Sequence, residues 1–128
     1  MISIFAQAEK HLKKTAIISD GAEYTYTQLL DASKAFAWTL LNDKNDLHEA
    51  RVAYMVNPGF DYVRVQWGIW RAGGVAVPLC LTYPLPSLRY TIENSGSSIV
   101  VVSPEFEDLL KPLCTELNLR LLTTDDRL

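Results

Sequence analysis

The sequence predicts an α/β domain: a layered, mostly parallel sheet of roughly four or five strands, covered by helices on both faces. Short apolar runs alternate along the chain with longer segments whose apolar residues have helical spacing. Several runs, such as Ile99–Val102, are apolar without alternation, which is typical of parallel strands buried on both faces. With 48% apolar and 21% charged residues, the composition also matches a globular core.

Length, charge and cysteine usage exclude several classes of protein. At 128 residues, the chain is one domain or part of a larger one. The net charge is −3 and the basic residues are scattered, so no nucleic acid partner is expected. Cys80 and Cys114 form no CxxC pattern, and His11 and His48 are remote, so we expect free thiols in a reducing cytoplasm and no metal site. No run approaches the ~20 apolar residues of a membrane span.

The N-terminal third predicts a helix, a hairpin and a second helix. Ile4, Phe5, Ala8 and Leu12 share one face of a short amphipathic helix with no signal-peptide character. Thr15–Ser19 and Glu23–Thr25 flank the turn signal Asp20-Gly21, as the strands of a hairpin do.

Thr25 and Gln28 have the spacing of a capping box, so a helix begins here. Its buried face carries apolar side chains at three-four spacing, and it ends near Asn42. These residues are Leu29, Leu30, Phe36, Ala37, Leu40 and Leu41.

Arg51–Val56 predicts the first parallel strand, and Asn57-Pro58 predicts the start of the helix that follows. Four large residues on that helix are expected in the core: Phe60, Val63, Trp67 and Trp70. Gly73 ends the helix because a residue without Cβ closes the last turn at positive φ. Val75–Leu79 is the next strand.

The same pattern then repeats twice. A helix entered at Pro84 and Pro86 runs to Ser95, with Gly96 at its C-terminal cap. After Ile99–Val102, Ser103-Pro104 opens a further helix, whose first turn carries Glu105, Glu107 and Asp108 to complement the helix dipole. Leu119–Leu122 predicts a last short strand.

Motifs that carry chemistry are absent from the sequence, which has no GxGxxG, GxxxxGK[ST], HExxH or GxSxG. Gly73-Gly74 follows a helix and precedes a strand, whereas phosphate loops run from a strand into a helix, so we interpret it as a helix stop. The loop Leu81–Pro86 follows a parallel strand, where open α/β sheets place ligands. The alternative for this loop is a rigid surface turn.

Three stretches in order resemble the AMP-binding, acyl-adenylate-forming superfamily. Thr25–Leu29 is similar to its T-Y-x-E-L element, with Gln28 in place of Glu. Trp70–Leu79 (WRAGGVAVPL) resembles its K-A-G-x-x-x-x-P-L element, and Leu88–Val102 resembles the segment that follows. Within the superfamily, Tyr62–Leu79 and Ser97–Val102 look most like the malonyl-CoA synthetase branch.

This resemblance implies an acid:CoA ligase of fatty acid metabolism that uses ATP, Mg and CoA. A carboxylic acid attacks ATP to give an acyl-adenylate and pyrophosphate, and CoA then takes the acyl group. The family's phosphate loop, magnesium-binding acidic element, ribose-binding Asp and C-terminal lysine match no residue of this sequence. We therefore assign no catalytic residue and no metal ligand. We expect residues 1–128 to be a single N-terminal subdomain, truncated before the phosphate loop, inactive alone and completed by the remainder of the ligase.

One transfer from the family concerns CoA. In relatives the loop after the Pro-Leu strand and the helix behind it approach the CoA nucleotide, which here corresponds to Thr82, Tyr83 and Arg89. Arg89 offers a fork to a phosphate, and the alternative is a solvated helix arginine. Two further hypotheses remain: a free-standing binding or assembly module derived from the family, and an independent small-nucleotide-binding domain, which the missing phosphate loop disfavours.

Overall fold

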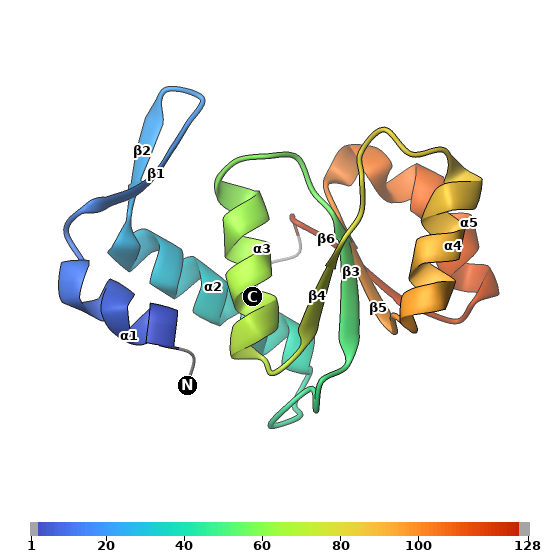
Figure 1. Cartoon of the computed structure of the whole chain (residues 1–128), viewed down its shortest axis with the longest axis horizontal. Coiled ribbons are helices and arrows are strands. Elements are labelled where there is room, and N and C mark those ends of the chain that lie inside the picture. Colours follow the sequence, from blue (N-terminus) through green and yellow to red (C-terminus); the bar gives the residue numbers. More distant parts are fainter. Residues whose placement is uncertain (1–2, 126–128) are drawn as a thin grey trace.

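Helices and strands alternate as predicted in the computed structural model, which describes residues 3–125 (Figure 1). In chain order the elements are α1 (Ser3–Ala8), a 3-10 turn (Glu9–His11), β1 (Thr15–Ser19), β2 (Ala22–Thr25), α2 (Tyr26–Leu41), β3 (Arg51–Met55), α3 (Phe60–Arg71), β4 (Val75–Pro78), α4 (Leu85–Ser95), β5 (Ile99–Val102), a second 3-10 turn (Pro104–Phe106), α5 (Glu107–Glu116) and β6 (Arg120–Thr123).

The main sheet has four parallel strands in the order β4-β3-β5-β6. Residues of β3 and β5 alternate between two cores, because successive side chains of a strand point to opposite faces. Val52 and Tyr54 pack beneath α2 and α3, whereas Ala53 and Met55 pack beneath α4 and α5. The predicted α/β class, with helices on both faces of a parallel sheet, is confirmed (Figure 1).

The strand order places a switch point at the centre of the sheet. From β3 the chain passes through α3 to the edge strand β4, then returns through α4 to β5 on the other side of β3. The neighbouring strands β3 and β5 are therefore followed by helices on opposite faces, α3 on one and α5 on the other. In open α/β sheets this arrangement opens a crevice at the carboxyl ends of the two strands.

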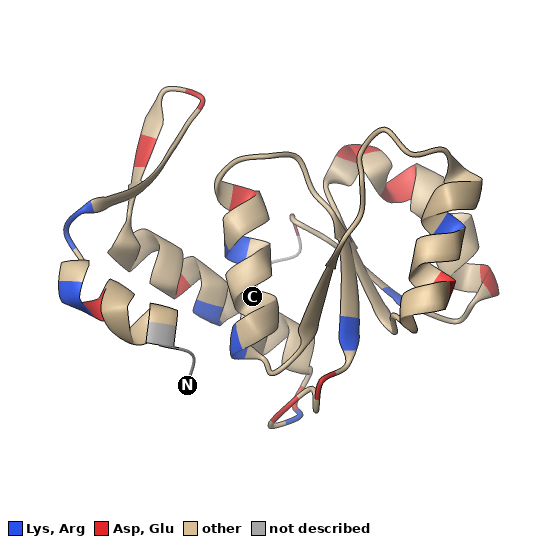
Figure 2. Cartoon of the chain, in the orientation of Figure 1, with Lys and Arg blue, Asp and Glu red and all other residues tan. Residues whose placement is uncertain are grey.

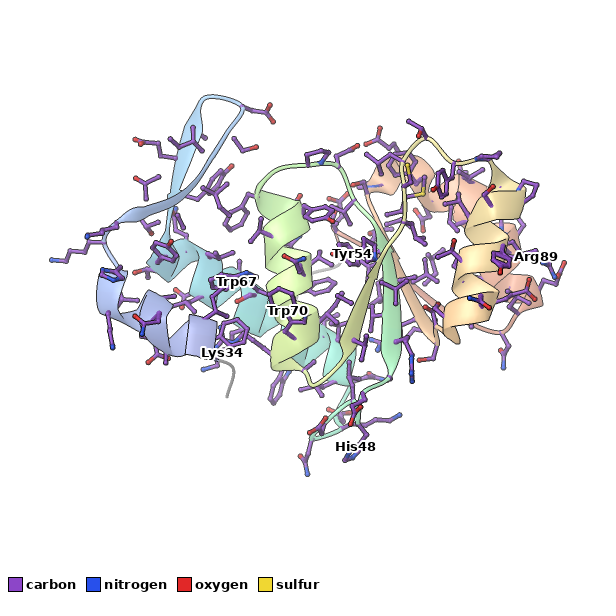
Figure 3. The ribbon with its side chains drawn as sticks, viewed as in Figure 1. Lys34, His48, Tyr54, Trp67, Trp70 and Arg89 are labelled. Carbon is purple, nitrogen blue, oxygen red and sulfur yellow. The ribbon has the colours of Figure 1, made fainter. Side chains whose placement is uncertain are left out.

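The N-terminal unit packs on the outer side of α2 and α3. The β1–β2 hairpin turns at Asp20 and Gly21, both at positive φ, and Thr25 and Gln28 form the predicted capping box at the start of α2. Trp67 is buried in a third cluster with residues of α1 and α2, and Trp70 packs against it (Figure 3).

Two predictions about the ends of helices are wrong. Leu12 is 42% exposed, because α1 stops at Ala8 and a 3-10 turn follows it. Ile4 lies within α1 and is 40% exposed, so Phe5 and Ala8 alone of the four predicted residues are buried. The helix after β3 begins at Phe60 with Gly59 as its N-cap, since Asn57 makes contacts elsewhere.

The remaining boundaries shift by one to three residues. The second predicted strand of the hairpin begins at Ala22, the strand after Gly73 stops at Pro78, and the last strand is Arg120–Thr123. Ser103-Pro104 opens a 3-10 turn and α5 follows at Glu107, so Glu105 lies before the helix. Gly73 and Gly96 have positive φ at the helix ends, as predicted.

Candidate functional site

A cleft of about 680 Å³ lies at the switch point of the sheet. Its floor and walls come from the segments that follow β3, β5 and β6, from α2, and from the tip of the β1–β2 hairpin. The volume falls within the range of small-molecule pockets. The cleft therefore occupies the position where this class of fold binds ligands.

Asn57 joins the segments that leave β3 and β5. Its backbone N–H donates to the Ser103 hydroxyl at 3.0 Å, and its side-chain Nδ2 donates to Glu105 Oε1. Ser103 is buried, and its own N–H donates to the Met55 carbonyl across the sheet. These bonds hold the two strand ends in place beneath the opening.

Arg64 forms the basic part of the cleft wall. It is only 6% exposed and lies over the Phe36 ring, 5.4 Å from the centroid. Nε and Nη2 both contact Asp61 Oδ1, at 3.1 and 3.0 Å, and Nη2 donates to the Thr124 carbonyl at 2.9 Å. Most of the donor capacity of this guanidinium is therefore used within the fold.

The hairpin closes one side of the cleft. Tyr24 stacks on Phe60, with ring centroids 4.2 Å apart. Gly59, at φ +141°, passes so close to the hairpin that a Cβ at this position would lie 2.7 Å from Ser19 Oγ. The absence of a side chain at Gly59 allows the start of α3 to meet β1.

The cleft is acidic. Asp20, Asp61, Glu105 and Asp125 line it, and Arg64 is the one basic residue among its described lining. Figure 2 shows acidic positions at the hairpin tip, in the first turn of α3 and in the segment between β5 and α5. This charge disfavours a phosphate-bearing ligand and favours a cation.

The predicted loop after β4 lies at the edge of the sheet and not at the switch point. Thr82 and Tyr83 are exposed, and the polar groups bond within the loop. Cys80 Sγ and Thr82 Oγ1 are 3.2 Å apart, and the Tyr83 N–H donates to the Cys80 carbonyl. The hydrogen bond from Thr82 lowers the pKa of the exposed Cys80 thiol.

Arg89 lies at the outer surface of α4 (Figure 3). Nε contacts Glu93 Oε1 at 3.1 Å, one turn further along the helix, and Nη2 contacts Glu116 at the end of α5. The hydrogen bonds that Arg89 donates to Glu116 and Glu93 raise the pKa of its guanidinium. The guanidinium is thus directed along α4 and away from Thr82 and Tyr83, which adjoin one another in the loop.

A buried network lies between the sheet and α3, on the face opposite α4. The hydroxyl oxygens of Tyr54 and Tyr62 are 3.3 Å apart, and Gln66 Nε2 donates to the Tyr54 hydroxyl at 3.3 Å. Burial raises the pKa of Tyr54, and the hydrogen bond with Tyr62 raises it further. Tyr54 is 1% exposed between β3 and α3, so the network supports the core (Figure 3).

The described residues, 3–125, contain neither a candidate metal site nor a candidate membrane span. In that range no three His, Cys, Asp or Glu side chains are grouped closely enough to hold a metal ion. Nor does any helix in that range have the length and apolar character needed to cross a membrane.

Sequence reasoning missed the cleft. A local signal exists, since Asn57 and Ser103 are polar residues that closely follow two apolar strands. What the sequence does not reveal is that these strands are neighbours. The order β4-β3-β5 brings the ends of β3 and β5 together and leaves the loop after β4 at an edge.

Comparison with known proteins connects this fold to adenylate-forming enzymes. The model of the AMP-binding enzyme family matches residues 4–126. The mitochondrial malonate–CoA ligase ACSF3 of Mus musculus is 35% identical over 125 residues, which cover 94% of this chain and 21% of that enzyme. The human enzyme is 32% identical over 123 residues. The chain spans about a fifth of the length of these curated relatives.

Two solved structures also resemble this chain in fold. Apo MatB from Rhodopseudomonas palustris has a TM-score of 0.79 and 26% identity, over 94% of this chain and 25% of MatB. The anthranilate CoA ligase AuaEII has a TM-score of 0.83 at 18% identity, over 94% of this chain and 24% of AuaEII, and so supports the fold alone. The predicted similarity to the malonyl-CoA synthetase branch is confirmed. The chain belongs to the AMP-binding enzyme family.

Proposed function

We propose that this chain is the N-terminal portion of an AMP-forming acid:CoA ligase that acts on malonate or a similar short dicarboxylic acid. The observation that carries the proposal is the match to malonate–CoA ligases, which extends over more than nine tenths of this chain but about a fifth of each enzyme. The remaining four fifths of the ligase, including its mobile C-terminal domain, would be its partner.

The residues present do not fit the phosphates of ATP. Within residues 3–125 no glycine-rich loop leads from a strand into a helix, and Gly73 closes α3 with its N–H bonded to the Trp70 carbonyl. The cleft at the switch point is acidic, and its guanidinium is already paired with Asp61. We therefore assign ATP, Mg and CoA to the whole ligase and derive no catalytic step from this chain.

What this chain contributes, in our proposal, is a folded layer. Its parallel sheet and the helices on both faces form a scaffold on which the catalytic segments are positioned. The second candidate is a free-standing module that binds or assembles without catalysis. It requires the same fold and would function without the rest of a ligase.

An exchange assay tests the proposed function. The purified 128-residue chain should give no malonate-dependent exchange of pyrophosphate into ATP, because its sequence has no counterpart of the family's phosphate loop. A chimera in which this chain replaces the matching N-terminal segment of MatB should exchange pyrophosphate with malonate. A folded but inactive chimera would favour the non-catalytic module, and robust exchange by the chain alone would contradict both proposals.

Contact with CoA at Thr82, Tyr83 and Arg89 is part of the same proposal. In the chimera, Thr82→Ala, Tyr83→Phe and Arg89→Ala should raise the KM for CoA and leave the exchange reaction, which precedes CoA, unchanged. Arg89 would have to leave Glu93 and Glu116 to reach a phosphate, so Glu116→Gln should lower the KM. If the KM for CoA in all four variants equalled that of the unaltered chimera, this loop would not contact CoA.

The cytoplasmic location predicted from cysteine usage stays a prediction. Relatives named as mitochondrial, including ACSF3 of Mus musculus and Homo sapiens, lie in the same family. Fluorescence microscopy of the tagged full-length protein would assign the compartment.

A further inference from the structure

The loop between α2 and β3 lies against the C-terminal end of α3 (Figure 1). The Leu47 N–H donates to the Ala72 carbonyl at 2.9 Å, and the Glu49 N–H donates to the Gly73 carbonyl at 2.8 Å. Carbonyl groups at the end of a helix have no donor within the helix itself. Residues 42–50, which we call the strap, therefore supply these donors from outside α3.

Two glycines form the surface on which the strap lies. A Cβ at Gly73 would overlap the Asp46 carboxylate, and a Cβ at Gly74 would lie 3.0 Å from Leu47 Cδ1. Gly96, at the end of α4, differs in that an added Cβ there meets nothing within 4 Å. Gly73-Gly74 therefore has a second role besides ending α3, because it lets the strap lie directly on the backbone.

The backbone of the strap is strained. Four of its residues have positive φ although none is glycine: Asn42, Asp43, His48 and Glu49, with φ between 47° and 74°. This region is costly for residues with a Cβ, and Glu is not among those that adopt it readily. The Asp46 carboxylate adds to the cost, since it lies at the negative end of the α3 dipole.

Few contacts hold the strap in place. Apart from Leu47 and Ala50, which are half-buried, its residues are exposed, and His48 lies at its outer edge (Figure 3). Leu47 packs against the core beneath α2 and α3. Asp46 Oδ1 accepts a hydrogen bond from the His48 N–H at 2.7 Å, but this bond lies within the strap and does not attach it to α3. Segments with few buried apolar contacts open most readily in native proteins.

We infer that the strap is a conformational device: residues 42–50 release from α3 as a unit while the main sheet stays folded. Strain favours the released state, whereas the two hydrogen bonds to α3 and the packing of Leu47 favour the closed state. Ala50, the last residue of the strap, accepts a hydrogen bond from the Val75 N–H at 2.9 Å, so release loosens the start of the edge strand β4. The inference does not rest on the proposed function, and its tests need no ligase activity.

Hydrogen exchange of the 128-residue chain, followed by ¹H–¹⁵N NMR at increasing urea, tests the inference. The amides of Leu47 and Glu49 should exchange through a local opening that low urea hardly changes. The amide of Val101, in the buried strand β5, should exchange only through global unfolding, which urea promotes steeply. The same rate and urea dependence at all three amides would overturn the inference, and so would exchange of the strap amides at the rate of an unstructured peptide.

A substitution beneath the strap should open it. In Gly73→Ala the added carbon displaces Asp46, so the two strap amides should exchange about tenfold faster relative to the β5 amide. Gly96→Ala is the matched control, because it also places a Cβ at positive φ at a helix end, but in open space. It should leave this ratio unchanged. Equal changes in the two variants would show that the glycine pair does not receive the strap.

A second pair of variants acts on the strain and leaves α3 unaltered, so it decides the question even if Gly73→Ala does not fold. Glu49→Gly removes the side chain at φ +65° and should slow exchange of the Leu47 amide about threefold. Lys44→Gly introduces a glycine into the same strap at a residue without positive φ, and should not slow it. Unchanged or faster exchange in Glu49→Gly would mean that the closed strap is not strained, and would overturn the inference.

Discussion

The cleft between β3 and β5 and the loop after β4 both follow the carboxyl ends of parallel strands, yet they differ in how they are held. The cleft is joined by contacts between residues far apart in sequence, such as Asn57 with Ser103 and Arg64 with Thr124. The loop bonds within itself, between Cys80, Thr82 and Tyr83. The comparison shows that the order of the strands, more than the end of any one strand, decides where an opening forms.

The largest expected effect separates two arginines, Arg64 in the wall of the cleft and Arg89 on α4, the helix that follows the loop. Arg64→Ala should lower the free energy of unfolding by about 3 kcal/mol, because it leaves the Thr124 carbonyl and the Phe36 ring without a buried partner. Arg89→Ala removes exposed ion pairs and should leave stability close to that of the unaltered chain. Urea denaturation measures both. Equal losses would mean that the cleft is no better organised than the surface of α4.

The next largest expected effect on stability comes from substituting two glycines. Gly59→Ala should cost about 2 kcal/mol, because φ +141° is strained for any residue with a Cβ and the new carbon meets Ser19 Oγ. Gly96→Ala also has positive φ but enters open space, and should cost about 1 kcal/mol. Thermal unfolding of the two variants compares them directly. A smaller loss of stability for Gly59→Ala than for Gly96→Ala would indicate that the hairpin moves to accommodate the added carbon. This wall of the cleft would then not be rigid.

Alkaline pH tests the core beneath α2 and α3, on the side of the sheet where the cleft lies. The raised pKa of Tyr54 means that the folded chain keeps this proton after the unfolded chain, with a tyrosine pKa of about 10, has lost it. The contribution to stability is therefore complete below about pH 10 and is lost as the pH rises further. Tyr54→Phe should flatten the decline in unfolding free energy above pH 10. Tyr90→Phe, on an exposed ring, should leave it steep.

The smallest effect is chemical and concerns the two thiols. Hydrogen bonding to Thr82 lowers the pKa of exposed Cys80, whereas burial raises that of Cys114. Iodoacetamide should therefore modify Cys80 in the folded chain and reach Cys114 only on unfolding, as followed by mass spectrometry of peptides. Thr82→Val should shift the pH profile of Cys80 alkylation upward. An unchanged profile would show that the loop does not hold Thr82 against the thiol.

The sequence predicts the fold well because its strongest signals are local. The capping box at Thr25 and Gln28 and the helix stops at Gly73 and Gly96 depend on residues within one or two turns. Asn57 shows the limit of that reasoning, since a local helix cap is a sound expectation for Asn-Pro. In the fold its backbone N–H donates to the Ser103 hydroxyl and its side-chain amide donates to Glu105. These residues lie 46 and 48 positions further along the chain.

The site could not be located from the sequence for the same reason. Alternation of strands and helices predicts parallel pairing but leaves open on which side of β3 each later strand lies. Leu81–Pro86 was therefore a reasonable candidate, and the edge position of β4 makes it the less enclosed of the two regions. The contacts of Arg89 with Glu93 and Glu116 likewise depend on how α4 meets α5.

The arginine of the last strand has a consequence for the order of folding during synthesis. Arg120 donates from Nη1 and Nη2 to the carbonyls of Leu40 and Thr39, at the end of α2. These carbonyls belong to the last turn of a helix, where no intrahelical donor remains. A nascent chain that has released α2 from the ribosome must extend by some 80 residues before this partner emerges. Until then the end of α2 depends on water, and the helix should complete its last turn only when β6 joins the sheet.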